Sequence, residues 1–87
     1  MAKSLHTPRY RRFRLKLIEA RKTAGLTQTD LAANLGRPQS FVSKFELGER
    51  RLDLIEFFDV ARAIGLDAVP FLVELGEIRT PTKRPRR

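Results

Sequence analysis

The sequence predicts an all-α, compact fold of five short helices. Apolar residues recur along the 87-residue chain at the three- and four-residue spacing of helices, which fits helices better than any arrangement of strands. Glycine is a typical helix stop, and five glycines punctuate the pattern every dozen residues or so: Gly25, Gly36, Gly48, Gly65 and Gly76. A chain this short forms one domain with a modest core.

The first expected helix covers about residues 8–24, starting at Pro8 or Arg9 and stopping at Gly25. Its polar face is heavily basic, and its inner side is expected to carry Leu17, Ile18, Ala20 and Ala24. The second starts at Thr27, whose hydroxyl can cap the backbone, while Asp30 favours the positive end of the helix dipole. Its buried stripe is expected to be Leu31, Ala32 and Leu35.

The third expected helix spans about residues 38–47. Its inward side chains should be Phe41, Val42 and Phe45. Its outward side chains are small, polar or cationic: Gln39, Ser40, Ser43 and Lys44.

A capping box, Asp53-x-x-Glu56, predicts the start of the fourth helix, which ends at Gly65. Its buried side chains should be Leu54, Phe57, Val60, Ala61 and Ile64. The fifth helix begins at Asp67 and tolerates Pro70 in its first turn. Its apolar residues are Val69, Phe71, Leu72 and Leu75.

The net charge of +8 is concentrated at the two ends of the chain. Residues 1–22 carry +7, residues 23–78 carry −4 and residues 79–87 carry +5. We expect a flexible N-terminal arm over residues 1–8, a helical domain over 9–76 and a basic flexible tail over 77–87. Clustered positive charge suits attraction to nucleic-acid phosphates, and basic ends that only aid solubility are the open alternative.

Several classes of protein are excluded by what the sequence lacks. No apolar run approaches the roughly 18 residues of a membrane span, and the N-terminus shows no secretory signal. The chain has no cysteine for disulfides or thiolate metal sites. We therefore expect a cytoplasmic protein without metal or cofactor. An enzyme is not expected, because the one histidine, His6, falls in the N-terminal arm and convergent catalytic groups are lacking.

Three segments carry a family resemblance: LTQTDLAANLG over residues 26–36, QSFVSKFE over 39–46 and GERR over 48–51. Together they closely resemble the phage repressor and Cro type, or xenobiotic-response-element type, of helix-turn-helix domain, from about Leu17 to Leu72. Two departures concern packing: Pro38 stands where the family usually has a Ser or Thr cap, and Leu52 where many members have proline.

The resemblance implies a sequence-specific DNA-binding transcriptional regulator, a repressor, whose third helix reads base edges in the major groove. The implied base-contact residues are Gln39, Ser40, Ser43 and Lys44. Gln can hold adenine through two hydrogen bonds, and Lys can donate to guanine acceptors. The implied phosphate-contact residues are Thr27, Gln28, Arg37, Arg50 and Arg51.

Two further contacts follow from the resemblance. Arg21 and Glu46 match a partly buried ion pair that links the first and third helices, and Gln28 is placed to bond to Gln39. For Gln28 a capping role alone, and for Arg51 an ion pair with Asp53, remain open alternatives.

The expected partner is a double-stranded DNA operator with an inverted repeat, bound by a homodimer whose expected contact surface is the fifth helix. Two alternatives remain open, because fold analogy cannot separate them. One is an antitoxin that binds both operator DNA and a toxin protein, and the other is a nonspecific nucleic-acid coating protein.

Overall fold

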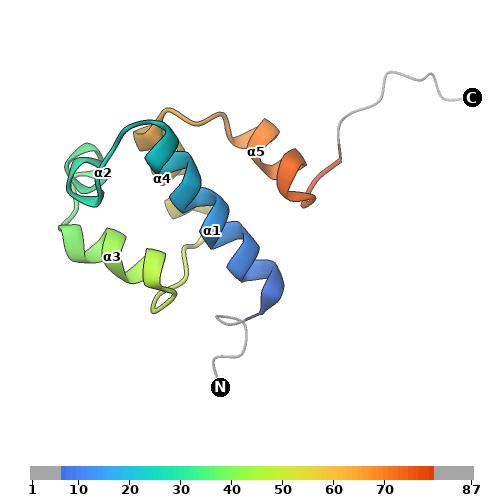
Figure 1. The fold of residues 1–87 in the computed structure, drawn as a ribbon, viewed down its shortest axis with the longest axis horizontal. Coiled ribbons are helices and arrows are strands. Elements are labelled where there is room, and N and C mark those ends of the chain that lie inside the picture. Colours follow the sequence, from blue (N-terminus) through green and yellow to red (C-terminus); the bar gives the residue numbers. More distant parts are fainter. Residues whose placement is uncertain (1–6, 80–87) are drawn as a thin grey trace, which may run out of the picture.

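Five α-helices occupy most of residues 7–79, the part of the chain that the computed structural model describes (Figure 1). They are α1 (Pro8–Thr23), α2 (Gln28–Leu35), α3 (Gln39–Leu47), α4 (Leu54–Ile64) and α5 (Ala68–Leu75). The prediction of an all-α fold with five helices is confirmed. Residues 1–6 of the predicted arm, His6 among them, and residues 80–87 of the predicted tail lie outside the described residues.

Local capping interactions fix where the helices begin. At α4, the backbone N–H of Glu56 donates to Asp53 Oδ1 at 2.7 Å, and the N–H of Asp53 donates back to Glu56 Oε1 at 3.0 Å, as the capping box predicts. At α3 the N-cap is Pro38, whose side chain has no oxygen to accept a backbone N–H. That helix begins at Gln39, one residue later than the sequence indicates.

The core is built between α1 and the α2–α4 unit. Its largest fully buried side chains come from all four of these helices: Phe45, Leu17, Leu31, Val42 and Val60. Each such burial contributes about 1.5 to 3 kcal/mol of hydrophobic free energy. In Figure 1, α1 runs through the middle of the molecule, with α3 and α5 on either side of it.

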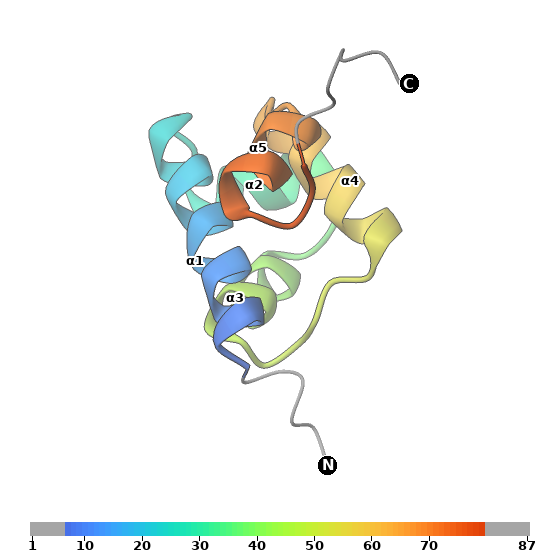
Figure 2. The same ribbon diagram turned by 90° about the vertical axis from the view of Figure 1, so that its right-hand side faces the viewer.

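An aromatic cluster docks α5 onto the rest of the molecule. The ring of Phe71 lies 6.1 Å from that of Phe13 in α1 and 5.7 Å from that of Phe57 in α4, measured between centroids. Figure 2 shows α5 lying between α1 and α4, which agrees with these contacts. Phe71 and Leu75 are only 3% and 8% exposed. The prediction that these two residues offer a dimer surface is therefore wrong, because they fill the core.

Two predicted core positions are wrong. Ala24 is exposed, since α1 ends at Thr23 and the chain turns away there. Leu54 is 64% exposed, because it is the first residue of α4 and its side chain is not covered by a neighbouring helix. The inner side of α1 instead includes Tyr10, whose hydroxyl accepts the Leu52 N–H at 3.1 Å.

Among residues 7–79, no helix is long and apolar enough to cross a membrane. Over the same residues, no group of three or more His, Cys, Asp or Glu side chains could hold a metal ion.

Candidate nucleic-acid interface

The turn between α2 and α3 is short and sharply bent. Gly36 has φ of +69°, in the left-handed region that glycine adopts without steric cost. The N–H of Arg37 then donates to the Ala32 carbonyl at 3.0 Å, which closes the end of α2. Ala32 is 3% exposed, and its small side chain lets the two helices pack closely.

This packing turns one face of α3 outward. The buried residues of α3 are Phe41, Val42, Phe45 and Glu46. Of the four predicted base-contact residues, Gln39, Ser40 and Lys44 are exposed and Ser43 is half-buried. All four therefore keep some surface on the solvent side of the helix.

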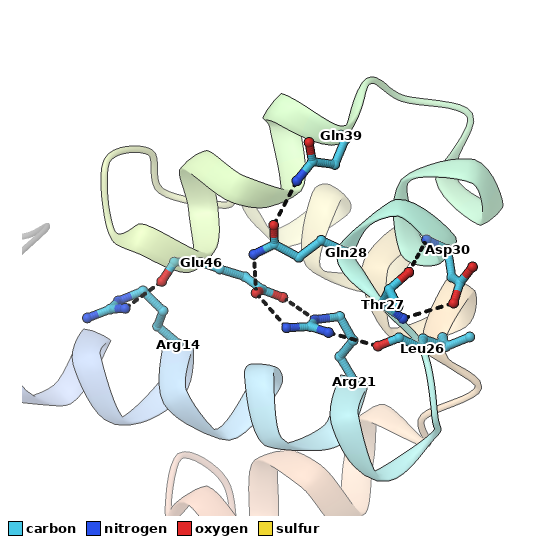
Figure 3. A network of polar contacts seen from close by, with 8 residues as sticks. All are labelled: Arg14, Arg21, Leu26, Thr27, Gln28, Asp30, Gln39 and Glu46. Atoms are coloured by element: carbon cyan, nitrogen blue, oxygen red, sulfur yellow. Dashed lines mark hydrogen bonds and ion pairs between the residues drawn. The ribbon is translucent and has the colours of Figure 1, made fainter.

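A chain of polar contacts connects the core to this outward face (Figure 3). Arg21 in α1 donates to Glu46 in α3 through Nε at 2.7 Å and Nη2 at 3.0 Å. Its Nη1 also donates to the Leu26 carbonyl at 2.7 Å. Gln28 Nε2 donates to Glu46 Oε1 at 2.9 Å, and Gln39 Nε2 donates to Gln28 Oε1 at 2.8 Å.

The Glu46 carboxylate, at the buried end of this chain of contacts, sets the direction of the hydrogen bonds that follow. The ionised carboxylate of Glu46 can only accept, so Gln28 must turn its amino group toward it and its carbonyl oxygen toward Gln39. Gln39 must then donate one amide hydrogen to Gln28. The Gln39 carbonyl oxygen and its second amide hydrogen are left for a ligand outside the protein.

Thr27 lies at the start of α2 and is exposed. Its Oγ1 accepts the N–H of Asp30 at 3.0 Å, and Asp30 Oδ2 accepts the N–H of Thr27 at 2.9 Å. The hydrogen bond from the Thr27 backbone lowers the pKa of the Asp30 carboxyl. Since a hydroxyl both accepts and donates, the Thr27 hydroxyl keeps its hydrogen for a further acceptor.

The predicted phosphate-contact arginines lie on both sides of α3. Arg37 and Arg50 each place the guanidinium carbon over the Phe41 ring, 4.3 and 4.8 Å from its centroid. Arg50 also donates to both carboxylate oxygens of Glu56, at 2.9 and 2.7 Å. The guanidinium of Arg51 lies 4.6 Å from the centroid of the Tyr10 ring.

The carboxylate of Glu56 is the polar group that sequence reasoning assigned to capping alone. Its side chain is 15% exposed, and Arg37 Nη2 lies 3.8 Å from Oε2. The hydrogen bonds from Arg50, followed by that from the Asp53 backbone, lower the pKa of Glu56 to about 2. The sequence gives no separate signal for this contact, because capping already accounts for an acidic residue at position 56.

Comparisons with known proteins agree with this arrangement. The helix-turn-helix family model of the Cro/C1 type matches residues 17–71. A solved structure described as an XRE-family like protein from Pseudomonas syringae pv. tomato str. DC3000 is 52% identical to this chain. The similarity covers 90% of this chain and 95% of that one, with a TM-score of 0.79. No curated protein matches the sequence. The chain belongs to the Cro/C1-type helix-turn-helix family of DNA-binding transcriptional regulators.

Proposed function

We propose that the protein represses transcription by binding a specific operator, with α3 in the major groove. The observation that carries this proposal is the contact chain from Arg21 through Glu46 and Gln28 to Gln39. It orients an exposed amide at the start of α3 before any DNA is present. A preorganised side chain loses less conformational entropy on binding than a mobile one.

The oriented amide of Gln39 matches adenine. Its carbonyl oxygen accepts from N6, and its remaining amide hydrogen donates to N7. Lys44, about one and a half turns further along α3, can donate to the guanine acceptors O6 and N7. Ser40 and Ser43, whose side chains are shorter, would supply further base contacts.

The phosphate contacts are proposed to flank this reading face. Thr27 and Gln28 lie at the N-terminus of α2, where the helix dipole favours an anion. Arg37, Arg50 and Arg51 lie in the segments before and after α3. These contacts would fix the position of α3 on the duplex and contribute most of the affinity that is independent of sequence.

We further propose a homodimer, with its contact surface on α4. Leu54 and Ile55 are 64% and 65% exposed and Phe58 is 40% exposed, and all three fall within the first half of the helix. A second copy would dock on this apolar surface rather than on the basic α1 segment. Each chain carries a net charge of +8, so two copies would repel each other where their basic residues meet. The alternative is that a toxin protein covers this α4 surface, in which case the protein is an antitoxin.

Selection of bound sequences from a random DNA pool tests the proposal. The wild type should select an inverted repeat with half-site centres about 34 Å apart. Gln39→Ala should lose about 1 to 3 kcal/mol at one base position in each half-site and relax the preference there alone. A pool without any enriched motif would contradict sequence-specific binding.

Sedimentation of Phe58→Glu beside Val69→Glu tests the dimer surface. Both residues are exposed apolar positions, but only Phe58 belongs to the α4 surface. The Phe58 variant alone should become monomeric at micromolar concentration. Dissociation by the Val69 variant alone would place the interface on α5.

A further inference from the structure

Two arginines from opposite ends of α3 meet at one carboxylate beside the proposed DNA-reading face. Arg37 precedes α3 and Arg50 follows it, yet both guanidinium groups stack on Phe41 and both approach Glu56 of α4. Arg50 binds the carboxylate with two hydrogen bonds, while Arg37 makes the longer contact of 3.8 Å.

The cluster is arranged with the negative charge inside and the positive charges outside. The Glu56 side chain is 15% exposed, whereas those of Arg37 and Arg50 are 44% and 38% exposed. The backbone N–H of Asp53 also donates to Glu56 Oε1, at 3.0 Å. Glu56 is therefore anchored at the start of α4, and the two arginine side chains beside it stay partly exposed to solvent.

A carboxylate and a phosphate bind a guanidinium through the same paired geometry. An anion already bound to Arg50 therefore competes with a DNA phosphate for the same donors. It also offsets part of the positive potential that attracts any duplex, whatever its sequence.

We propose that Glu56 competes with the DNA backbone for Arg37 and Arg50 and thereby limits the affinity of the protein for any duplex. It holds Arg37 and Arg50 on the Phe41 ring and weakens their attraction to phosphates. Nonspecific binding reports this competition most directly, because that binding depends almost entirely on phosphate contacts. This inference rests on the proposed phosphate contacts of the two arginines.

The test compares the salt dependence of binding to a nonspecific duplex for the wild type and Glu56→Gln. Gln keeps an oxygen that can accept the Asp53 N–H but loses the charge. Each additional phosphate that the variant binds should steepen the slope of log K against log salt by about 0.9. Relative to 1 M salt, that slope corresponds to roughly eightfold tighter binding per phosphate at 0.1 M. The selected operator motif should stay the same, because Glu56 makes none of the proposed base contacts.

Asp59→Asn is the matched control, because it makes the same change in net charge at an exposed carboxylate of the same helix. It should leave the salt slope close to that of the wild type. Equal slopes for Glu56→Gln and Asp59→Asn would overturn the proposal, since the effect would then be one of overall charge.

Glu56→Asp provides a second variant without any change in net charge. Asp at this position can still cap the helix, as Asp30 does in the equivalent place in α2, but its carboxylate is one methylene farther from Arg50. It should steepen the slope in the same direction as Glu56→Gln. A slope unchanged from the wild type in both folded variants would refute the competition. Failure of the wild type to bind any duplex would instead contradict the DNA-binding function itself.

Discussion

Removing one partner of the Arg21–Glu46 ion pair should strongly destabilise the protein. The two side chains are only 9% and 5% exposed, so Arg21→Met would leave a carboxylate without its cation in the interior. Breaking a buried pair in this way costs about 3 to 5 kcal/mol. The remaining hydrogen bond from Gln28 offsets part of this loss, while the Leu26 carbonyl loses a donor. We therefore expect a loss near the lower end, about 3 kcal/mol.

Urea unfolding at pH 7 measures this loss directly. With an m-value of about 1.5 kcal/mol/M, the midpoint should fall by about 2 M. The control is the double variant Arg21→Met/Glu46→Gln, which removes the charge but keeps an oxygen for Gln28. It should recover more than half of the lost free energy, since no unpaired charge remains in the core.

Two results would refute this reasoning. An Arg21→Met midpoint within about 0.3 M of the wild type would mean that the pair is solvated in solution. A double variant no more stable than the single variant would mean that the cost arises from lost packing of the Arg21 side chain, not from the unpaired carboxylate.

Three other predictions can be checked by thermal or urea unfolding. Gly48→Ala should cost more than Gly36→Ala: both have positive φ, worth about 1 to 2 kcal/mol, but only at Gly48 would the new Cβ lie 3.2 Å from an arginine Nε. Equal losses would mean that this side chain moves aside freely. Tyr10→Phe should cost about 1 to 3 kcal/mol by leaving the buried Leu52 N–H unpaired, and an unchanged midpoint would show that water replaces the hydroxyl. Folding lowers the pKa of Glu56 from its ordinary value of 4.5 to about 2, so the ionised carboxylate stabilises the fold fully above pH 4.5. This contribution should disappear as the pH falls from there toward about 2. Over that range the wild type should lose more stability than Glu56→Gln, and parallel curves would contradict this.

The helix boundaries could be predicted because their signals are local. The capping boxes at Thr27 and Asp53 join residues three positions apart, so the pattern and the interaction are the same short segment. Core positions were predicted less well where a helix extends past its neighbours. Leu54 has nearly the same angular position on α4 as Ala61, but only Ala61 is covered. Periodicity gives the direction of a side chain and not whether another helix reaches it.

Two contacts between distant segments had no sequence signal. The Tyr10 hydroxyl and the Leu52 N–H are 42 residues apart, and the ion pair of Arg9 with Glu77 joins residues separated by 68. Basic residues flank Tyr10 in the sequence, so this part of α1 has the pattern of a basic polar face. Only the packing of α1 against the loop before α4 shows that Tyr10 lies inside.

Some contacts of the candidate site could likewise be predicted from the sequence and others could not. The contact of Gln28 with Gln39 could be expected from the family resemblance, because both residues belong to the matching segments. The second role of Glu56 could not, because its capping role already accounts for an acidic residue at that position. One carboxylate here serves two partners, the backbone of Asp53 and the guanidinium of Arg50. Since the capping role is satisfied by Gln or Asp as well, only the arginine contact requires a full-length anionic side chain, and the variants of Glu56 separate the two roles.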